Sequence, residues 1–191
     1  MKKLFFIPAS LLLACVIAAS SAFVYLKYFH LSGWIHNGPW NTNLSMGTSD
    51  TGIYDKAWTA MFSALSPSNV NVYYKVYTDD NGEPLHSSCD YLIQGEALDT
   101  RWWSLTVYME DGFLIPNPQK RYSWNKYNAE FNDDGSFLIN LSSQQQEGNW
   151  IPLADYLGKL SMTLRLYHPG QMFYDKPESV ALPKITKENC S

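Results

Sequence analysis

Motifs of known catalytic chemistry are missing from this 191-residue sequence. It has no GxSxG nucleophile elbow, no GxGxxG or P-loop, and no HExxH zinc motif. None of its four histidines has metal-ligand spacing to another: His30, His36, His86 and His168. We therefore expect no metal and no cofactor. Whether the chain is an enzyme stays open, although these absences favour a binding role.

Basic residues are also few. The chain has 14 Lys and Arg against 18 Asp and Glu, which gives a net charge of −4, and its positive residues form no patch. Nucleic-acid binding relies on such a patch to neutralise phosphates, so we exclude nucleic acid as a partner. The same shortage excludes a purely electrostatic attachment to anionic lipid.

One uncharged run of 23 residues, Leu4 to Leu26, follows two lysines near the N-terminus. About 20 helical residues cross a bilayer, whereas the apolar region of a signal peptide has only about 7–15, so we favour an uncleaved signal anchor. Two alternatives stay open: a signal peptide cleaved near Ser20-Ser21-Ala22, and a lipoprotein signal at Leu12 to Cys15. All three place residues 28–191 outside the cytoplasm, because positive charge stays inside. We expect a single-pass inner-membrane protein whose C-terminal domain lies in the periplasm or outside the cell.

Cysteine is scarce, with three residues and no CxxC pair. Cys15 lies in the uncharged run, whereas Cys89 and Cys190 lie in the part expected to be exported. That compartment is oxidising, so we predict a disulfide between Cys89 and Cys190 that ties the C-terminal tail to the strand at Cys89. The alternative is that one of the two is a reactive thiol.

Residue patterns divide the remaining chain into a lead-in and a β-rich part. Residues 28–53 are rich in Gly, Asn, Ser and Thr and are expected to be extended, and Tyr54–Leu65 has the spacing of an amphipathic helix. The stretches that follow alternate apolar with polar residues between the turn signals Asn81-Gly82, Asp111-Gly112 and Asp134-Gly135.

These patterns predict a mainly-β fold. We expect a jelly-roll-like antiparallel β-sandwich with one N-terminal amphipathic helix, preceded by a single transmembrane helix. The expected divisions are residues 1–27 for the signal anchor, 28–53 for the lead-in and 54–191 for the β-sandwich domain.

The segment TRWWSLTVY, residues 100–108, places two tryptophans side by side. Because alternate side chains of a strand face opposite ways, Trp103 belongs to an apolar face and Trp102 to a polar one. The strand at 162–167 divides in the same way. If the two strands share a sheet, one face collects Trp102, Ser104, Thr106, Tyr108, Thr163, Arg165 and Tyr167.

Rings beside hydroxyls suit a polar organic ligand such as a sugar or glycan. The alternative is a second core layer, with Arg165 paired to a carboxylate under the loop that carries Trp150. The candidate ligand contacts are Trp102, Tyr108, Arg165, Tyr167 and His168, the last of which ends the second strand.

An ordered set of segments resembles the bacterial family called domain of unknown function 1214: DDNGEPL, RWWSLTVY, DGFLIPNPQKRYS, DDGSFLINL, NWIPL and LRLYHPG. The lead-in GPWNTNLSMGTSDTGIYDKA is similar to that of the family's short, membrane-anchored members. The resemblance spans about Gly38 to Pro183, with Lys56 standing where an arginine is expected. It implies a jelly-roll-like β-sandwich with an N-terminal helix, and it implies no reaction.

The sequence therefore favours an envelope-anchored β-sandwich that binds a polar organic or glycan ligand. One alternative is an enzyme with a site at one end of the sandwich, built from Arg165, His168 and Tyr108. The other is a scaffold that binds envelope proteins through a sheet edge.

Overall fold

The computed structural model describes residues 2–25, 33–45, 52 and 70–190. The chain divides into two compact units, one of Met1–Trp34 with Ser45–Ser68 and one of Ile35–Leu44 with Asn69–Ser191. The amphipathic helix expected at Tyr54–Leu65 lies outside the described residues.

The first unit contains α1, a helix of 23 residues from Lys2 to Val24 that includes Pro8. Its described apolar side chains are exposed, with 61% of Leu11 and 69% of Leu12 accessible. Within the described part of the chain, no helix combines the length and the apolar character that crossing a membrane requires. The transmembrane helix of the predicted fold is thus not found among the described residues.

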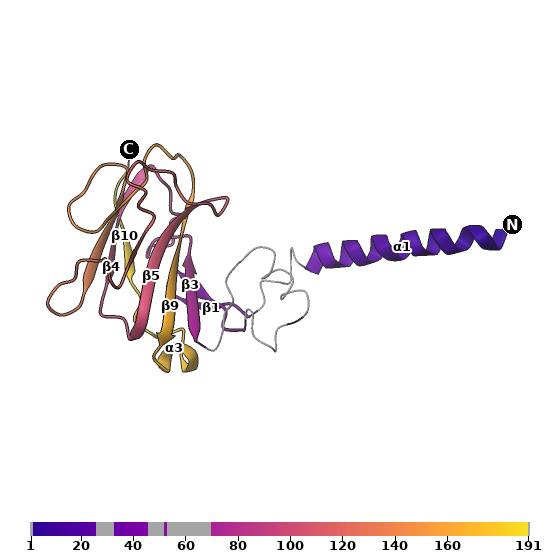
Figure 1. Cartoon of the computed structure of the whole chain (residues 1–191), viewed down its shortest axis with the longest axis horizontal. Helices are drawn as coiled ribbons and strands as arrows, with labels where there is room; N and C mark the ends of the chain where they lie inside the picture. Colours follow the sequence, from indigo (N-terminus) through magenta and orange to yellow (C-terminus); the bar gives the residue numbers. More distant parts are fainter. Residues whose placement is uncertain (1, 26–32, 46–51, 53–69, 191) are drawn as a thin grey trace. The chain divides into compact units, whose positions relative to one another are not determined.

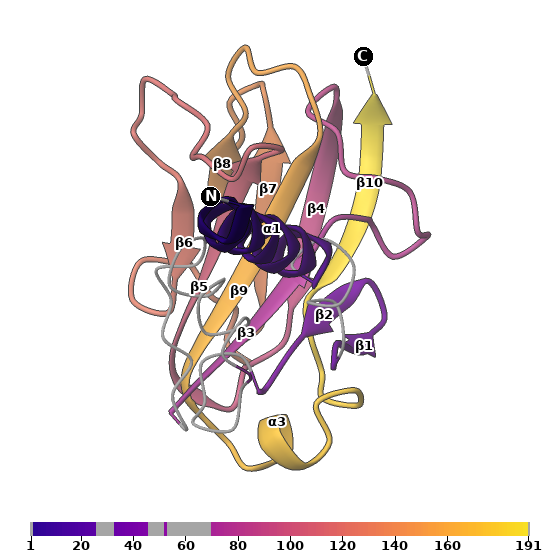
Figure 2. The ribbon, with the colours of Figure 1, turned by 90° about the vertical axis from the view of Figure 1, so that its right-hand side faces the viewer.

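The second unit is built on a six-stranded sheet with the order β1-β2-β3-β9-β5-β6. Every neighbouring pair in it is antiparallel, and Figure 2 shows its strands in succession. The strands are β1 (Ile35–Asn37), β2 (Trp40–Thr42), β3 (Asn71–Val76), β9 (Leu160–Pro169), β5 (Thr100–Met109) and β6 (Ser123–Asn125). The extended lead-in expected at 28–53 thus contributes β1 and β2 to the sheet.

A second sheet has four strands in the order β10-β4-β7-β8. They are β10 (Lys184–Cys190), β4 (Cys89–Gly95), β7 (Phe137–Ser142) and β8 (Trp150–Pro152). The pair β7–β8 is parallel, which departs from the antiparallel prediction. The chain loops back after β7 and runs beside it again, where the Asn140 N–H donates to the Asn149 carbonyl and the Leu153 N–H to the Ser142 carbonyl. A short helix, α3 (Met172–Asp175), lies between β9 and β10 in the chain.

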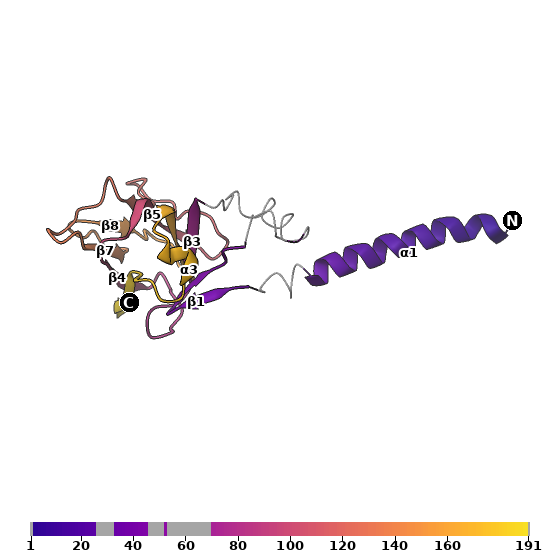
Figure 3. The same cartoon turned by 90° about the horizontal axis from the view of Figure 1, so that it is seen from below.

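The two sheets enclose one hydrophobic core, and Figure 3 shows them as two layers. β3 alternates half-buried with buried residues, and β4 does nearly the same. Between the layers, Trp103 of β5 stacks on Phe137 of β7, with the ring centroids 4.6 Å apart. The mainly-β prediction is confirmed, and the longer strands of the two sheets turn buried apolar side chains toward a shared core.

Two of the predicted turns are confirmed by the positive φ angles of their glycines. Gly82 and Gly112 have φ angles of 83° and 84° and follow Asn81 and Asp111. A residue with a Cβ adopts this backbone at a cost, and glycine does not. In the first turn, one carboxylate oxygen of Asp79 also accepts the backbone N–H groups of Asn81 and Glu83.

A disulfide joins Cys89 to Cys190, the first residue of β4 to the last of β10, across 101 positions of sequence. These are the two cysteines that the sequence analysis pairs. Cys15 is a free and exposed cysteine on α1. The bridge holds β10, an edge strand, against β4 at the end where its side chains are exposed.

Candidate functional site

The candidate site is the surface of the six-stranded sheet that faces away from the core. Trp102 pairs with Tyr167 and Ser104 with Arg165, so the two strands share a sheet as the sequence analysis required. Directly paired side chains lie on the same face. We call this surface the polar face: Asn71, Tyr73 and Lys75 of β3, Thr163, Arg165 and Tyr167 of β9, Trp102, Ser104, Thr106 and Tyr108 of β5, and Ser123 and Asn125 of β6.

The β3 contribution to the polar face was missed by sequence reasoning. Tyr73 pairs with Arg165 and Lys75 with Thr163, although β3 and β9 lie far apart in the chain. The alternation in NVNVYYKV separates these two residues from the core side chains. That signal identifies a polar side of β3, but it does not identify β9 as the neighbouring strand.

Three aromatic rings from three adjacent strands form a row across the polar face. Tyr167 of β9 lies in the middle, with its ring centroid 5.1 Å from that of Trp102 and 6.4 Å from that of Tyr73. Both contacts are edge-to-face, the arrangement that the charge distribution of aromatic rings favours. All three side chains are half-buried, so each keeps part of its surface open.

Burial first, and then the charge and the hydrogen bond of the Tyr167 side chain, raise the pKa of Tyr73 to about 12. Nearby Arg165 acts in the opposite direction, because its positive charge favours the phenolate. The Tyr73 phenol therefore remains protonated at neutral pH. It keeps a hydroxyl hydrogen and places no negative charge on the polar face.

Arg165 is the central charged group of the polar face. It is half-buried and donates from Nη1 to Thr106 Oγ1 at 3.1 Å and from Nη2 to Tyr108 Oη at 2.5 Å. Its guanidinium carbon also lies 5.6 Å from the centre of the Tyr108 ring. Although Arg165 pairs with Ser104 in the sheet, its side chain extends toward the C-terminal end of β5 and away from Tyr167.

The alternative prediction is a second core layer in which Arg165 pairs with a carboxylate under the loop that carries Trp150. Within the ranges that the structure describes, Arg165 has no such partner. Trp150 belongs to β8 of the other sheet, where it is buried and its indole Nε1 donates to the Ser142 carbonyl at 3.0 Å. Among the described residues, the one ion pair joins Lys159 to Glu110 at 3.7 Å. Within this part of the chain, Arg165 is thus held by two hydroxyls and a ring, and not by a carboxylate.

Small hydroxyl side chains form the floor of the polar face. Ser104, Thr106 and Thr163 are only 7%, 8% and 6% exposed, beneath the longer side chains around them. A ligand would therefore meet the ring edges and the guanidinium first. One floor residue holds Arg165, because Thr106 Oγ1 accepts a hydrogen bond from its guanidinium.

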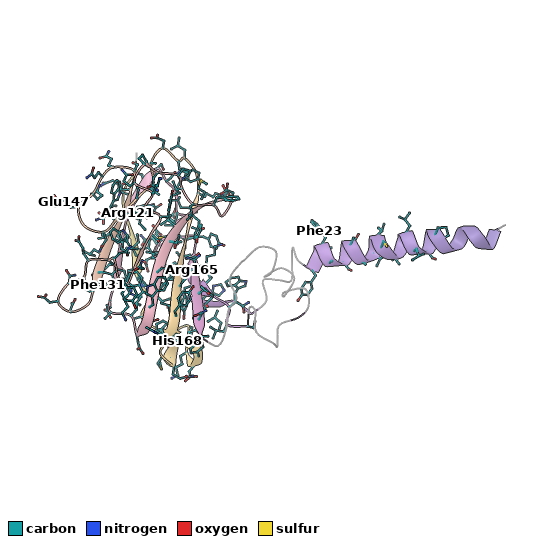
Figure 4. All side chains as sticks on the ribbon, in the orientation of Figure 1. Phe23, Arg121, Phe131, Glu147, Arg165 and His168 are labelled. Atoms are coloured by element: carbon teal, nitrogen blue, oxygen red, sulfur yellow. A yellow bond between two sulfur atoms is a disulfide. The ribbon has the colours of Figure 1, made fainter. Side chains whose placement is uncertain are left out.

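The predicted cluster of Arg165, Tyr108 and His168 is not assembled. Tyr108 contacts Arg165, but His168 is exposed at the far end of β9, near α3 in Figure 4, and has a φ angle of 49°. The Arg165 side chain extends in the other direction along the sheet. Tyr108, Arg165, Trp102 and Tyr167 belong to one face, whereas His168 does not join them.

A hollow lies outside the polar face, at the end of the sheet where β3 ends and β9 begins. It has a volume of about 360 Å³ and is lined by Tyr77, Thr78, Pro84, Leu85, Glu110, Lys159, Leu160 and Ser161. Its two charged groups are the exposed ion pair. Within the described ranges, no three His, Cys, Asp or Glu side chains gather in a way that could hold a metal ion.

One known family matches the part of the chain that carries the polar face. The family model for a protein of unknown function (DUF1214) matches residues 70–171, which include all of β3, β5, β6 and β9. No curated protein sequence matches the chain.

Two solved structures are similar. The VPA0106 protein of Vibrio parahaemolyticus is 22% identical with a TM-score of 0.61, and the match covers 73% of this chain and 36% of that one. A putative uncharacterized protein from Burkholderia cenocepacia is 19% identical with a TM-score of 0.49, and the match covers 90% of this chain and 42% of that one. The chain thus spans less than half the length of either protein, and the first likeness supports the fold alone.

Proposed function

We propose that this chain, which belongs to the DUF1214 family of proteins of unknown function, binds a polar organic ligand such as a glycan on the polar face. The observation that carries this proposal is the row of half-buried rings formed by Trp102, Tyr167 and Tyr73 beside a hydrogen-bonding arginine. Sugar rings present apolar C–H surfaces edged by hydroxyls. Aromatic rings next to polar groups match that chemistry.

A catalytic role has less support. The three groups that could form an acid–base cluster, Arg165, Tyr108 and His168, are not brought together. Rings and hydroxyls positioned on rigid strands are sufficient for recognition, because binding needs complementary shape and hydrogen bonding without a titrating group.

Trp102→Ala is expected to abolish most of the affinity for a neutral oligosaccharide. The substitution removes a stacking ring, which contributes roughly 1–3 kcal/mol where nucleobases stack on aromatic side chains and corresponds to roughly a 5- to 150-fold weaker Kd. Full-length chain in detergent micelles is titrated calorimetrically with maltohexaose, cellohexaose and chitohexaose. The melting temperature of each variant is measured in parallel.

Phe113→Ala is the matched control, because Phe113 is a 71% exposed ring in the turn after β5, outside the polar face. It should leave both the affinity and the melting temperature unchanged. The proposal fails if no oligosaccharide binds the native chain, or if Trp102→Ala binds as tightly as the native chain does.

We also infer that this jelly-roll-like β-sandwich is held at the inner membrane by its N-terminal segment, with the β-rich unit outside the cytoplasm. The support is the uncharged run Leu4–Leu26 behind two lysines and the exposed apolar side chains of α1. A helix that exposes apolar side chains gains free energy in an apolar environment. The Cys89–Cys190 disulfide suits an oxidising compartment.

Washing of isolated membranes with alkaline carbonate is expected to leave the chain in the pellet. Carbonate removes peripheral proteins, but a helix embedded in the bilayer stays with the lipid. Intact-mass measurement of the retained protein should give the full-length chain. A mature chain that starts at Phe23, or one acylated at Cys15, would contradict the uncleaved anchor.

A further inference from the structure

The polar face is more positive than the rest of the chain. Its residues include two cations, Lys75 and Arg165, and no aspartate or glutamate, although acidic residues outnumber basic ones overall. The two cations come from neighbouring strands, and Lys75 is paired with Thr163, two residues along β9 from Arg165. The Lys75 Nζ lies 5.2 Å from the centre of the Tyr77 ring, and among the described residues neither cation of the polar face is paired with a carboxylate.

The hydrogen bonds around Arg165 leave mainly donors facing outward. A guanidinium has five N–H groups and no acceptor. Thr106 Oγ1 and Tyr108 Oη each accept one of these hydrogens; Thr106 is buried, whereas the half-buried Tyr108 keeps its own hydroxyl hydrogen as a donor. The guanidinium and the Tyr108 hydroxyl therefore offer donors to a single acceptor-rich partner. They have little to offer a group that must itself donate.

We infer, on the basis of the proposed function, that the ligand of the polar face is an acidic sugar whose carboxylate binds Arg165. A carboxylate is planar, accepts hydrogen bonds only, and matches two parallel N–H groups of a guanidinium. The backbone of Arg165 lies two residues along β9 from that of Tyr167, about 7 Å of strand. Its guanidinium reaches further along the face, to Thr106 and Tyr108. A short oligosaccharide therefore can stack on the ring row and place a carboxylate at Arg165. Lys75 adds a second positive charge on the same side.

The test compares trigalacturonate with its methyl ester, in which each carboxyl group has lost its charge and gained a methyl group. Calorimetric titration of the full-length chain in detergent micelles should give an affinity for the acid roughly 10- to 100-fold higher than for the ester. Arg165→Gln should make the two affinities nearly equal, because the affinity for the acid falls toward that for the ester. Arg165→Lys keeps the charge but lacks the bidentate fork, so it should also lose most of the preference and serves if the glutamine variant does not fold.

Two control variants separate charge, position and stacking. Lys184→Gln removes one exposed positive charge from β10 of the other sheet and should leave the preference for the acid unchanged. Trp102→Ala should weaken the binding of acid and ester by the same factor, because it removes the stacking ring and not the guanidinium. The preference for the acid should also fall as salt is added, since screening weakens a partly exposed charge pair.

Each other outcome has a distinct meaning. Equal binding of acid and ester by the native chain, with both weakened in Trp102→Ala, would overturn the acidic-sugar inference and leave the proposed function intact. Binding of a neutral oligosaccharide at Trp102 without binding of trigalacturonate would do the same. Failure of every sugar to bind would overturn both. Inorganic phosphate that binds Arg165 as tightly as trigalacturonate would assign the site to a free oxyanion and overturn the inference.

Discussion

Replacing both Cys89 and Cys190 by alanine is expected to lower the free energy of unfolding by about 4–5 kcal/mol. The bridge spans 101 positions, and in the chain-entropy model closing a loop of about 100 residues in the unfolded state contributes about 4.7 kcal/mol. The cost has a local source as well, because β10 is an edge strand in which Ile185 is the one buried residue. Chemical denaturation of the native chain in the absence of reductant measures the change.

Cys15→Ala is the matched control, since Cys15 is a free cysteine on α1. It removes one sulfur without opening a loop and should leave the unfolding midpoint of the β-rich unit unchanged. Peptide mapping under non-reducing conditions should recover residues 89 and 190 in one cross-linked fragment. Two alkylatable thiols at these positions in protein prepared without reductant would refute the bridge.

The adjacent tryptophans should respond to alanine substitution very differently. Trp103 is 2% exposed and stacks on Phe137, so Trp103→Ala leaves a large cavity and should cost about 3–5 kcal/mol of stability. Trp102 is half-buried and loses chiefly its edge contact with Tyr167, worth about 0.5–1.5 kcal/mol. Thermal melts should show Trp103→Ala lower by roughly 10–20 °C and Trp102→Ala by a few degrees.

Equal losses of melting temperature in the two variants would change the interpretation of the polar face. If Trp102→Ala lowers the melting temperature as much as Trp103→Ala, the Trp102 ring is structural and the polar face is a second core layer. A matched pair of this kind is informative because the two variants remove the same atoms from neighbouring positions. Only the side of the sheet differs between them.

Much of the candidate site could be predicted because strand alternation is a local property. Trp102 and Trp103 differ by one position, and the pleat alone places them on opposite faces. The same rule separates Arg165 from the apolar residues Leu164 and Leu166 on either side of it, which are fully buried. The turn glycines are local as well, since each requirement for positive φ involves only a few residues.

Short strands were not predictable in the same way. β1 and β2 have three residues each, too few for a period to show, and they lie in a segment whose composition indicates a lead-in. β10 has a single buried residue, so it shows no alternation, and it is a strand because its backbone pairs with β4. The parallel pairing of β8 with β7 likewise depends on how one loop returns.

The sequence by itself determined which side chains of each strand are apolar, where the turns fall, and that Cys89 and Cys190 are the cysteines to pair. These follow from local backbone geometry and composition. The tertiary structure alone decided that β3 lies beside β9, so that Tyr73 and Lys75 join Trp102 and Arg165. It also turned Arg165 toward Thr106 and Tyr108 and left His168 at the far end. Strand order and side-chain direction depend on contacts between residues distant in sequence, which no local pattern encodes.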